Sequence, residues 1–202
     1  NSGNNIYFNE LDVQYRDVDI NIVDLGNACW VDKHFTDDIQ TRQYRAPEVI
    51  LSQSYDTSSD MFSLGCIIFE LITGDLLFDP HAGRTWDRDE DHIAMMMELM
   101  GNFPKKMYSI PKQSHTSSTT NSTTNSTNNA SNKKNRCLEY FESDGTLKHI
   151  DHLKDWRLQD VLIDKYKFTP MDAKGLARFI EPMLEVCIYW VYVCICSVCV
   201  YM

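Results

Sequence analysis

The tripeptide Asp24-Leu25-Gly26 is the first place in this sequence where a carboxylate could do chemistry. Residues 18–25 alternate between apolar and polar types and then meet Gly26, a pattern that predicts a strand entering a turn. A carboxylate at such a strand end is well placed to hold a hard cation against phosphate oxygens. Alone, the tripeptide is a weak signal, because an ordinary aspartate turn has the same sequence.

Two further motifs follow it in a fixed order. The first is Thr41-Arg42-Gln43-Tyr44-Arg45-Ala46-Pro47-Glu48, and the second is Asp60-Met61-Phe62-Ser63-Leu64-Gly65. Protein kinases place a D-F-G motif before an A-P-E motif, with the activation loop between them. Because the order and the short spacing both hold, the three motifs together resemble the activation segment and central helix of a protein kinase.

The resemblance narrows to the SR-protein-specific kinases, which phosphorylate Arg-Ser-rich splicing factors. It covers about residues 18–112 and 137–185. The LAMMER-type kinases are the nearest alternative, but their own signature after the central helix is not found here. The stretches that carry the resemblance are 24–30 (DLGNACW), 34–45 (HFTDDIQTRQYR), 74–81, 88–94 (RDEDHIA), 147–156 and 165–166.

The resemblance implies a role for each matching residue of the catalytic region. Asp24 would chelate Mg²⁺ that bridges the ATP phosphates, and Thr41 would hydrogen-bond the catalytic aspartate. Arg45 would help shape the pocket next to the target serine. Glu48 would pair with an arginine near the end of the domain, and Asp60 would anchor the catalytic loop from below.

A substrate-docking groove is implied as well. The family builds it from acidic residues, a lysine and a neighbouring tryptophan, which correspond here to Asp75, Asp91, Glu98, Lys165 and Trp156. Arg84 departs from the family, which tends to carry a glutamate there, and should weaken or redirect the docking of Arg-rich peptides.

Simpler interpretations of several of these residues remain open. Asp60 could be only a helix N-cap residue. Asp91 and Glu98 could be a solvated helix face. Trp156 could be a core aromatic.

The elements that must position these residues are mostly helical. Residues 61–72 are apolar on nearly all sides, follow the N-cap types Thr57-Ser58-Ser59-Asp60 and precede Gly74, so we expect a helix buried in the centre of the core. A further helix is predicted at 93–100: the acids Asp89-Glu90-Asp91 precede it and complement its dipole, and it ends at Gly101. Helices are also predicted at 158–163 and 170–184. Residues 1–17 indicate a linker or spacer remnant, and residues 18–185 a partial kinase domain.

Two segments depart from that domain. Residues 113–135 form a Ser/Thr/Asn tract that cannot bury enough apolar surface to fold, so we expect a disordered insertion. Residues 186–202 carry no charge and form an aberrant apolar tail. As a helix this tail would fall short of a bilayer core, and it lacks basic flanks, so a membrane anchor is disfavoured.

Several parts of a complete kinase are not found in the sequence. It contains no glycine-rich loop, no strand lysine and no H-R-D catalytic loop. The expected fold is therefore mainly α, the large C-terminal lobe of the kinase fold without the N-terminal lobe. The intact enzyme would use ATP and Mg²⁺ to phosphorylate serines in Arg-Ser-rich proteins, and this chain alone would be inactive. The alternative is a pseudokinase or docking module that binds Arg-rich proteins without phosphorylating them.

Composition limits the partners and the compartment. A net charge of −10 argues against direct binding of nucleic acid and suits a basic partner, although acids also simply solubilise a surface. Seven cysteines, four of them in the tail, do not make a disulfide framework and fit a reducing compartment. The resemblance to the SR-protein-specific kinases implies a monomer in the cytoplasm and nucleus.

Overall fold

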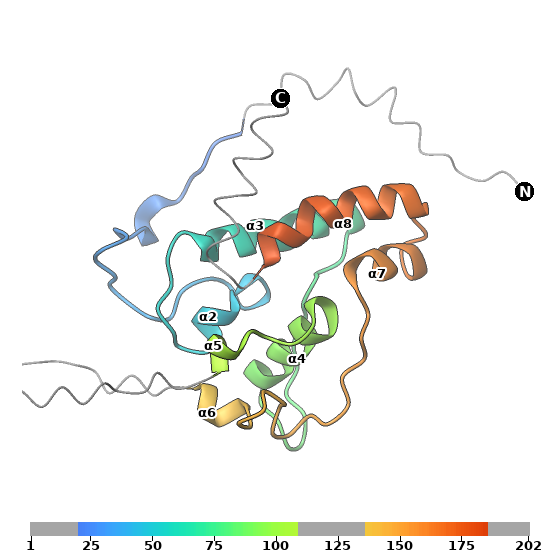
Figure 1. Ribbon diagram of the computed structural model, residues 1–202. Helices are drawn as coiled ribbons and strands as arrows, with labels where there is room; N and C mark the ends of the chain where they lie inside the picture. Colours follow the sequence, from blue (N-terminus) through green and yellow to red (C-terminus); the bar gives the residue numbers. More distant parts are fainter. Residues whose placement is uncertain (1–19, 109–135, 186–202) are drawn as a thin grey trace, which may run out of the picture. The chain divides into compact units, whose positions relative to one another are not determined.

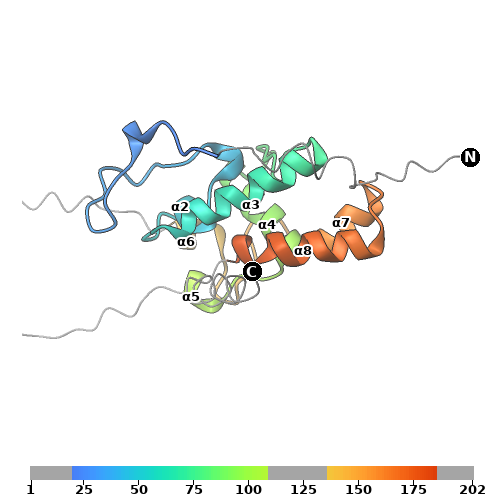
Figure 2. The same cartoon turned by 90° about the horizontal axis from the view of Figure 1, so that it is seen from above.

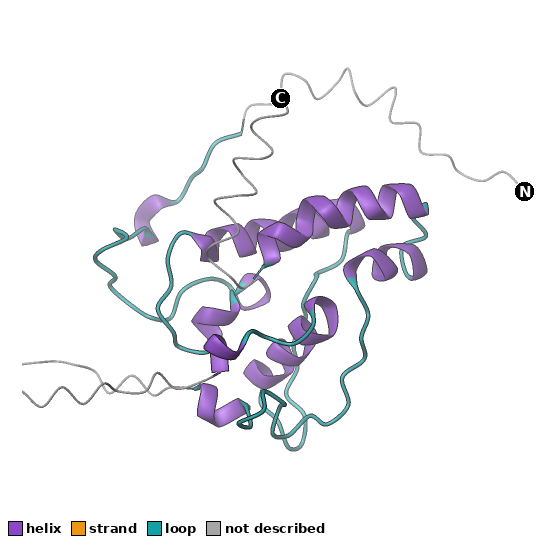
Figure 3. Cartoon of the chain, viewed as in Figure 1, coloured by secondary structure: helices purple, strands orange, loops and turns teal. Residues whose placement is uncertain are grey.

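The computed structural model describes residues 20–108 and 136–185 and divides the chain into two units, Asn1–Phe35 and Thr36–Met202. The predicted linker (1–17), insertion (113–135) and apolar tail (186–202) lie outside the described residues. The described part is helical with connecting loops (Figure 3). None of its helices is both long enough and apolar enough to cross a bilayer.

The strand predicted at residues 18–25 is wrong for the part that the structure describes. Residues 20–24 are extended loop, and η1 (Leu25–Asn27) is a single turn of 3-10 helix. Asp24 precedes that turn with a left-handed backbone, φ 61°. A strand needs a neighbouring strand to satisfy its backbone groups, and the described residues of this unit supply only one isolated bridge, between Trp30 and Lys33.

The predicted central helix is confirmed as α3 (Ser58–Thr73). Its first free amide, that of Ser58, donates to Asp56 Oδ1 at 2.8 Å, and the helix ends at Gly74, whose φ of 80° favours glycine. One face, including Phe62 and Phe69, is buried. Burial on all sides was wrong, because a parallel stripe of apolar side chains is exposed among the described residues: Leu64, Ile67, Leu71 and Ile72.

The second predicted helix begins at Arg88, more than one turn earlier than expected, as α4 (Arg88–Met100). The Asp87 side chain caps it, because its Oδ1 accepts hydrogen bonds from the amides of Asp89 (2.9 Å) and Glu90 (2.8 Å). The acidic residues predicted to precede the helix thus form its first turn, where they complement the helix dipole. Gly101 ends the helix with φ 91°.

The core of the second unit lies between α3, α4 and the two last helices. α8 (Pro170–Leu184) runs alongside α3 in both views (Figures 1 and 2), and α7 (Leu158–Asp164) packs against α8. Phe69 of α3 meets the ring of Tyr166 edge-on, with centroids 5.6 Å apart. The remaining helical pieces are short: η2 (Arg42–Tyr44), α2 (Pro47–Ile50), α5 (Lys105–Tyr108) and α6 (Cys137–Tyr140).

Candidate active site and docking surface

Asp24 lies in the first unit, and its side chain is exposed. Magnesium in phosphate-transfer sites is held by one or two carboxylates together with the phosphates themselves, rather than by an all-protein cage. The single exposed carboxylate of Asp24 is consistent with this kind of magnesium coordination. In the described ranges no group of three or more His, Cys, Asp or Glu side chains could hold a metal by itself.

The loop before η2 is fixed by Gln40, a residue that the sequence analysis missed. The Gln40 backbone is left-handed, with φ 67°. Its side-chain Nε2 donates to the carbonyl of Ser59 (2.6 Å) and to Ser63 Oγ (2.8 Å), and its Oε1 accepts from the amide of Ala46 (2.9 Å). One amide side chain therefore ties both ends of the loop to α3. No sequence signal would have found it, because glutamine has no preference for positive φ.

Arg45 is held from two sides within the same loop. Its guanidinium donates to the carbonyl of Gln40 (2.9 Å) and pairs with Asp38 Oδ1 (2.9 Å). Thr41 stands just before η2, and its carbonyl accepts the amide of Tyr44 at 3.0 Å. The Thr41 side chain is exposed and does not cap η2. The Arg45 side chain is thus fixed, while the Thr41 hydroxyl faces solvent.

Glu48 and Asp60 lie near the start of α3 but in different environments. Glu48 is half-buried, and burial raises its carboxyl pKa although Ser59 Oγ donates to Glu48 Oε1 at 2.7 Å. Among residues 20–108 and 136–185, no lysine or arginine forms an ion pair with Glu48. Asp60 is exposed in the first turn of α3. It is not the N-cap residue, because Thr57 occupies that position and the capping oxygen comes from Asp56.

The structure brings Asp75 and Lys165 together. Lys165 Nζ lies 2.9 Å from Asp75 Oδ2, and the Tyr166 hydroxyl donates to the same oxygen at 2.8 Å. The hydrogen bonds from Lys165 and Tyr166 lower the pKa of Asp75. The hydrogen bond with Tyr166, followed by that with Asp75, raises the pKa of Lys165. Both side chains of the ion pair are half exposed, so the carboxylate stays accessible to a second cation.

Asp91 and Glu98 each brace a loop from α4. Asp91 Oδ2 accepts the amide of His81 at 2.8 Å. Glu98 Oε1 accepts the amide of Lys154 (2.8 Å), and the Glu98 carbonyl accepts the amide of Trp156 (3.0 Å). Both acids are half-buried and engaged with backbone, so they are more than a solvated helix face.

Trp156 and Arg84 complete the predicted docking set. Trp156 is half-buried, with the Lys154 ammonium 4.6 Å from its ring centroid, and Arg84 is exposed. Among the described residues, direct contacts join Asp75 to Lys165 and Glu98 to Trp156. In the same part of the chain no direct contact joins these two pairs to each other, or either pair to Asp91.

Comparison with known proteins shows which family this chain belongs to. The family model of the protein kinase domain matches residues 3–185. The chain belongs to the protein kinase domain family. This kinase chain is also similar to several curated SR-protein kinases, so the resemblance to that group is confirmed.

Three relatives of the kinase chain illustrate the match. It is 44% identical over 167 residues to the serine/threonine-protein kinase SRPK of Physarum polycephalum, covering 82% of this chain and 34% of that protein. It is 42% identical to SRSF protein kinase 3 of Homo sapiens, covering 90% and 28%. It is 42% identical to SKY1 of Saccharomyces cerevisiae, covering 83% and 20%. The chain spans about a third or less of the length of these relatives.

Proposed function

We propose that this chain is the large C-terminal lobe of a serine/threonine kinase that transfers the γ-phosphoryl group of ATP to serines in Arg-Ser-rich proteins such as SR splicing factors. The observation that carries the proposal is the match of residues 3–185 to the protein kinase domain, with the kinase motifs in order along the chain. The substrate class is supported by relatives whose name is SRSF protein kinase 3, at 42% identity.

The residues of this chain would act by positioning and by charge. Bound MgATP supplies the phosphoryl group, and Asp24 would hold the magnesium ion. Thr41 would orient the catalytic aspartate through its exposed hydroxyl, while the fixed Arg45 shapes the wall of the pocket for the serine. Phosphoryl transfer depends almost entirely on such positioning and charge stabilisation. The 202 residues contain no H-R-D motif and no glycine-rich loop, so we do not expect this chain alone to transfer phosphate.

A second candidate is a docking module that binds Arg-rich proteins without phosphorylating them. The observation in its favour is that the acidic set Asp75, Asp91 and Glu98 is present in a chain without the catalytic base. In either case we expect the protein to act as a monomer in the cytoplasm and nucleus, without contacting nucleic acid.

Both candidates predict a salt-sensitive docking site for Arg-Ser peptides, which we call the acidic groove (Asp75, Asp91 and Glu98). Each exposed ion pair is worth only about 0.2–1 kcal/mol, so affinity comes from several arginines together. Asp91→Lys should weaken binding of a labelled Arg-Ser peptide about tenfold, since it removes one attraction and adds a repulsion. Arg84→Glu should strengthen binding several-fold, and raising the salt should weaken it for every variant.

The matched control is Glu142→Lys, which makes the same charge change at an exposed acid in the turn between Phe141 and Leu147. It should lower affinity much less than Asp91→Lys. Fluorescence anisotropy at low and high salt measures all four proteins. Affinity that ignores Asp91→Lys, or that does not fall with salt, would mean that these acids only brace loops.

A further inference from the structure

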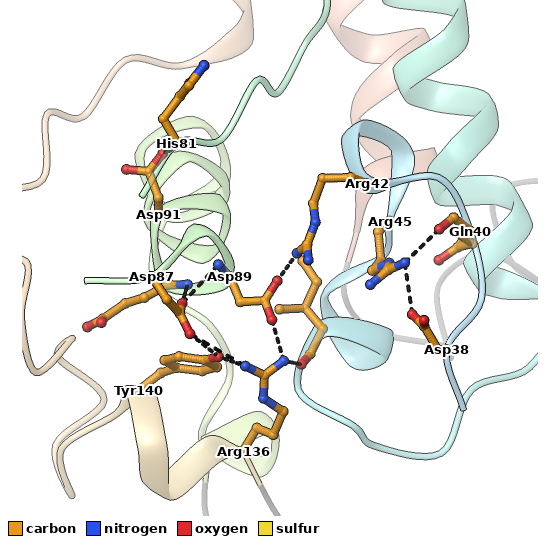
Figure 4. A network of polar contacts seen from close by, with 12 residues as sticks. Asp38, Gln40, Arg42, Arg45, His81, Asp87, Asp89, Asp91, Arg136 and Tyr140 are labelled. Atoms are coloured by element: carbon orange, nitrogen blue, oxygen red, sulfur yellow. Dashed lines mark hydrogen bonds and ion pairs between the residues drawn. The ribbon is translucent and has the colours of Figure 1, made fainter. Parts of the chain in front are cut away.

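A buried carboxylate outside the proposed docking set joins two distant segments of the second unit (Figure 4). Asp89, in the first turn of α4, is 8% exposed. Its Oδ1 forms an ion pair with Arg42 of η2, and its Oδ2 forms another with Arg136 at the start of α6. Asp89 is therefore a bridge between the loop of the kinase activation segment and α6.

Arg136 is itself fixed by several neighbours. It pairs with Asp87 Oδ2 (3.6 Å) and with Glu139 Oε2 (3.5 Å), and its guanidinium lies 5.0 Å from the ring centroid of Tyr140. The Tyr140 hydroxyl donates to Asp87 Oδ2 at 3.0 Å, which closes the ring of contacts. Arg136 also reaches the carbonyl of Ile50 in α2 at 3.5 Å. The position of the Arg136 side chain is therefore fixed by its contacts with α2, α4 and α6.

At the other end of the bridge, burial and neighbouring positive charges disfavour the charged form of Arg42. Burial, and then the positive charges of Arg45, Arg88 and Arg136, lower the pKa of Arg42. The negative charge of Asp38 opposes this effect, but it ranks last among the causes. The side chains of Arg42 and Asp89 are 28% and 11% exposed, so removing the Asp89 carboxylate leaves a partly desolvated guanidinium charge without this partner, which is destabilising. Arg42 consequently depends on the Asp89 carboxylate for its place in η2.

We propose that Asp89 is a positioning residue for residues 40–46, and that it couples α6 to this loop through Arg136. Arg42 begins the helical turn that Thr41 precedes and Arg45 follows, so a shift of Arg42 moves both residues. The inference rests on the proposed function in one respect: the proposed function makes residues 40–46 the wall of the pocket beside the target serine. The coupling itself is a property of the fold.

Backbone hydrogen exchange of the full chain tests the coupling. The amides of Tyr44, Arg45 and Ala46 are all hydrogen-bonded within the loop, so they report its opening. Asp89→Asn keeps the shape of the side chain and removes its charge. We expect these amides to exchange about ten- to a hundredfold faster, the change that follows loss of a hydrogen bond to a charged group. Amides in the middle of α3 and α8 should be unaffected.

Two further variants separate positioning from general stability. Arg136→Ala should also speed exchange at residues 40–46, although the contacts of Arg136 are with α2, α4 and α6, and Arg136→Lys should restore part of the protection. In the Asp89→Asn background Arg136→Ala should add little, because the bridge is already broken. The matched control is Asp155→Asn, which breaks the exposed Asp155–Arg157 pair (2.8 Å) and should leave the loop unchanged.

Each outcome decides the proposal. Exchange at residues 40–46 that is unchanged by both Asp89→Asn and Arg136→Ala overturns it, as does acceleration of α3 and α8 by the same factor. If Asp89→Asn does not fold, Arg136→Ala against Asp155→Asn decides alone. Failure of an Arg-Ser peptide to bind the wild-type chain would overturn the proposed function and leave the exchange result standing. Normal peptide binding together with unchanged exchange would overturn the coupling and leave the proposed function standing.

Discussion

Replacing Gln40 with alanine should lower the unfolding free energy of this chain by about 3 kcal/mol. The substitution removes hydrogen bonds from Gln40 to the Ser59 carbonyl, Ser63 Oγ and the Ala46 amide. Ala46 is fully buried, so its N–H group would be left without a partner away from water. The measurement is urea denaturation followed by circular dichroism.

The control for Gln40 must share its unusual backbone. Ser52 is another non-glycine residue with positive φ, at 55°. Ser52→Ala keeps that backbone strain, so it should change stability by no more than about 1 kcal/mol. Equal losses in the two variants would show that the side-chain amide of Gln40 is unimportant and that only the backbone conformation matters.

The Gln40 prediction also concerns how the loop around Arg45 is ordered. Gln40 and Asp38 together hold Arg45 by a carbonyl and a carboxylate. In many kinases such a loop is ordered by a phosphate that pairs with arginine. Here the chain itself supplies both acceptors for Arg45, the carbonyl of Gln40 and the carboxylate of Asp38.

Gly65→Ala should destabilise the second unit by about 1–3 kcal/mol, although alanine is the better helix former. A Cβ atom at Gly65 would lie 2.9 Å from Leu184 Cδ2 and 3.1 Å from Met183 Cβ. Met183 Cβ is fixed to the backbone of α8, so relief requires α3 and α8 to move apart. Thermal unfolding followed by circular dichroism measures the effect as a lower Tm.

Gly175→Ala in α8 is the matched control, because a Cβ atom there meets nothing within 4 Å. It should stabilise the protein by roughly 0.5–1 kcal/mol through helix propensity alone. The same substitution thus has opposite signs at the two positions. A rise in Tm for both variants would show that α3 and α8 are not in close contact at Gly65.

The helices were predictable because their signals are local. Residues 61–72 form an apolar run between N-cap residue types and Gly74, and residues 170–184 have helical patterning. The structure places α3 at Ser58–Thr73 and α8 at Pro170–Leu184. Burial around α3 was overestimated, since composition alone does not tell which apolar side chains find a partner. Leu71 is 80% exposed.

The parts of the site that were not predictable depend on contacts between distant residues. Gln40 meets Ser63, and Asp89 meets Arg136, across stretches of sequence without any shared motif. Asp89 was expected only as an acid that complements a helix dipole, and Arg42 only as part of a motif. The strand at 18–25 failed for a related reason: an alternating pattern becomes a strand only where another strand pairs with it.

The central claim is that this chain is the magnesium-holding and substrate-facing part of an Arg-Ser-directed kinase. The direct measurement is phosphate transfer by a chimera, in which residues 20–185 of this chain replace the matching segment of the Physarum polycephalum SRPK, with radiolabelled ATP, Mg²⁺ and an Arg-Ser peptide. We predict labelling of the peptide on serine, at least a thousandfold less with Asp24→Ala, and none by the 202-residue chain alone. A folded chimera that binds the peptide but transfers no phosphate, or that keeps its rate with Asp24→Ala, would contradict the account.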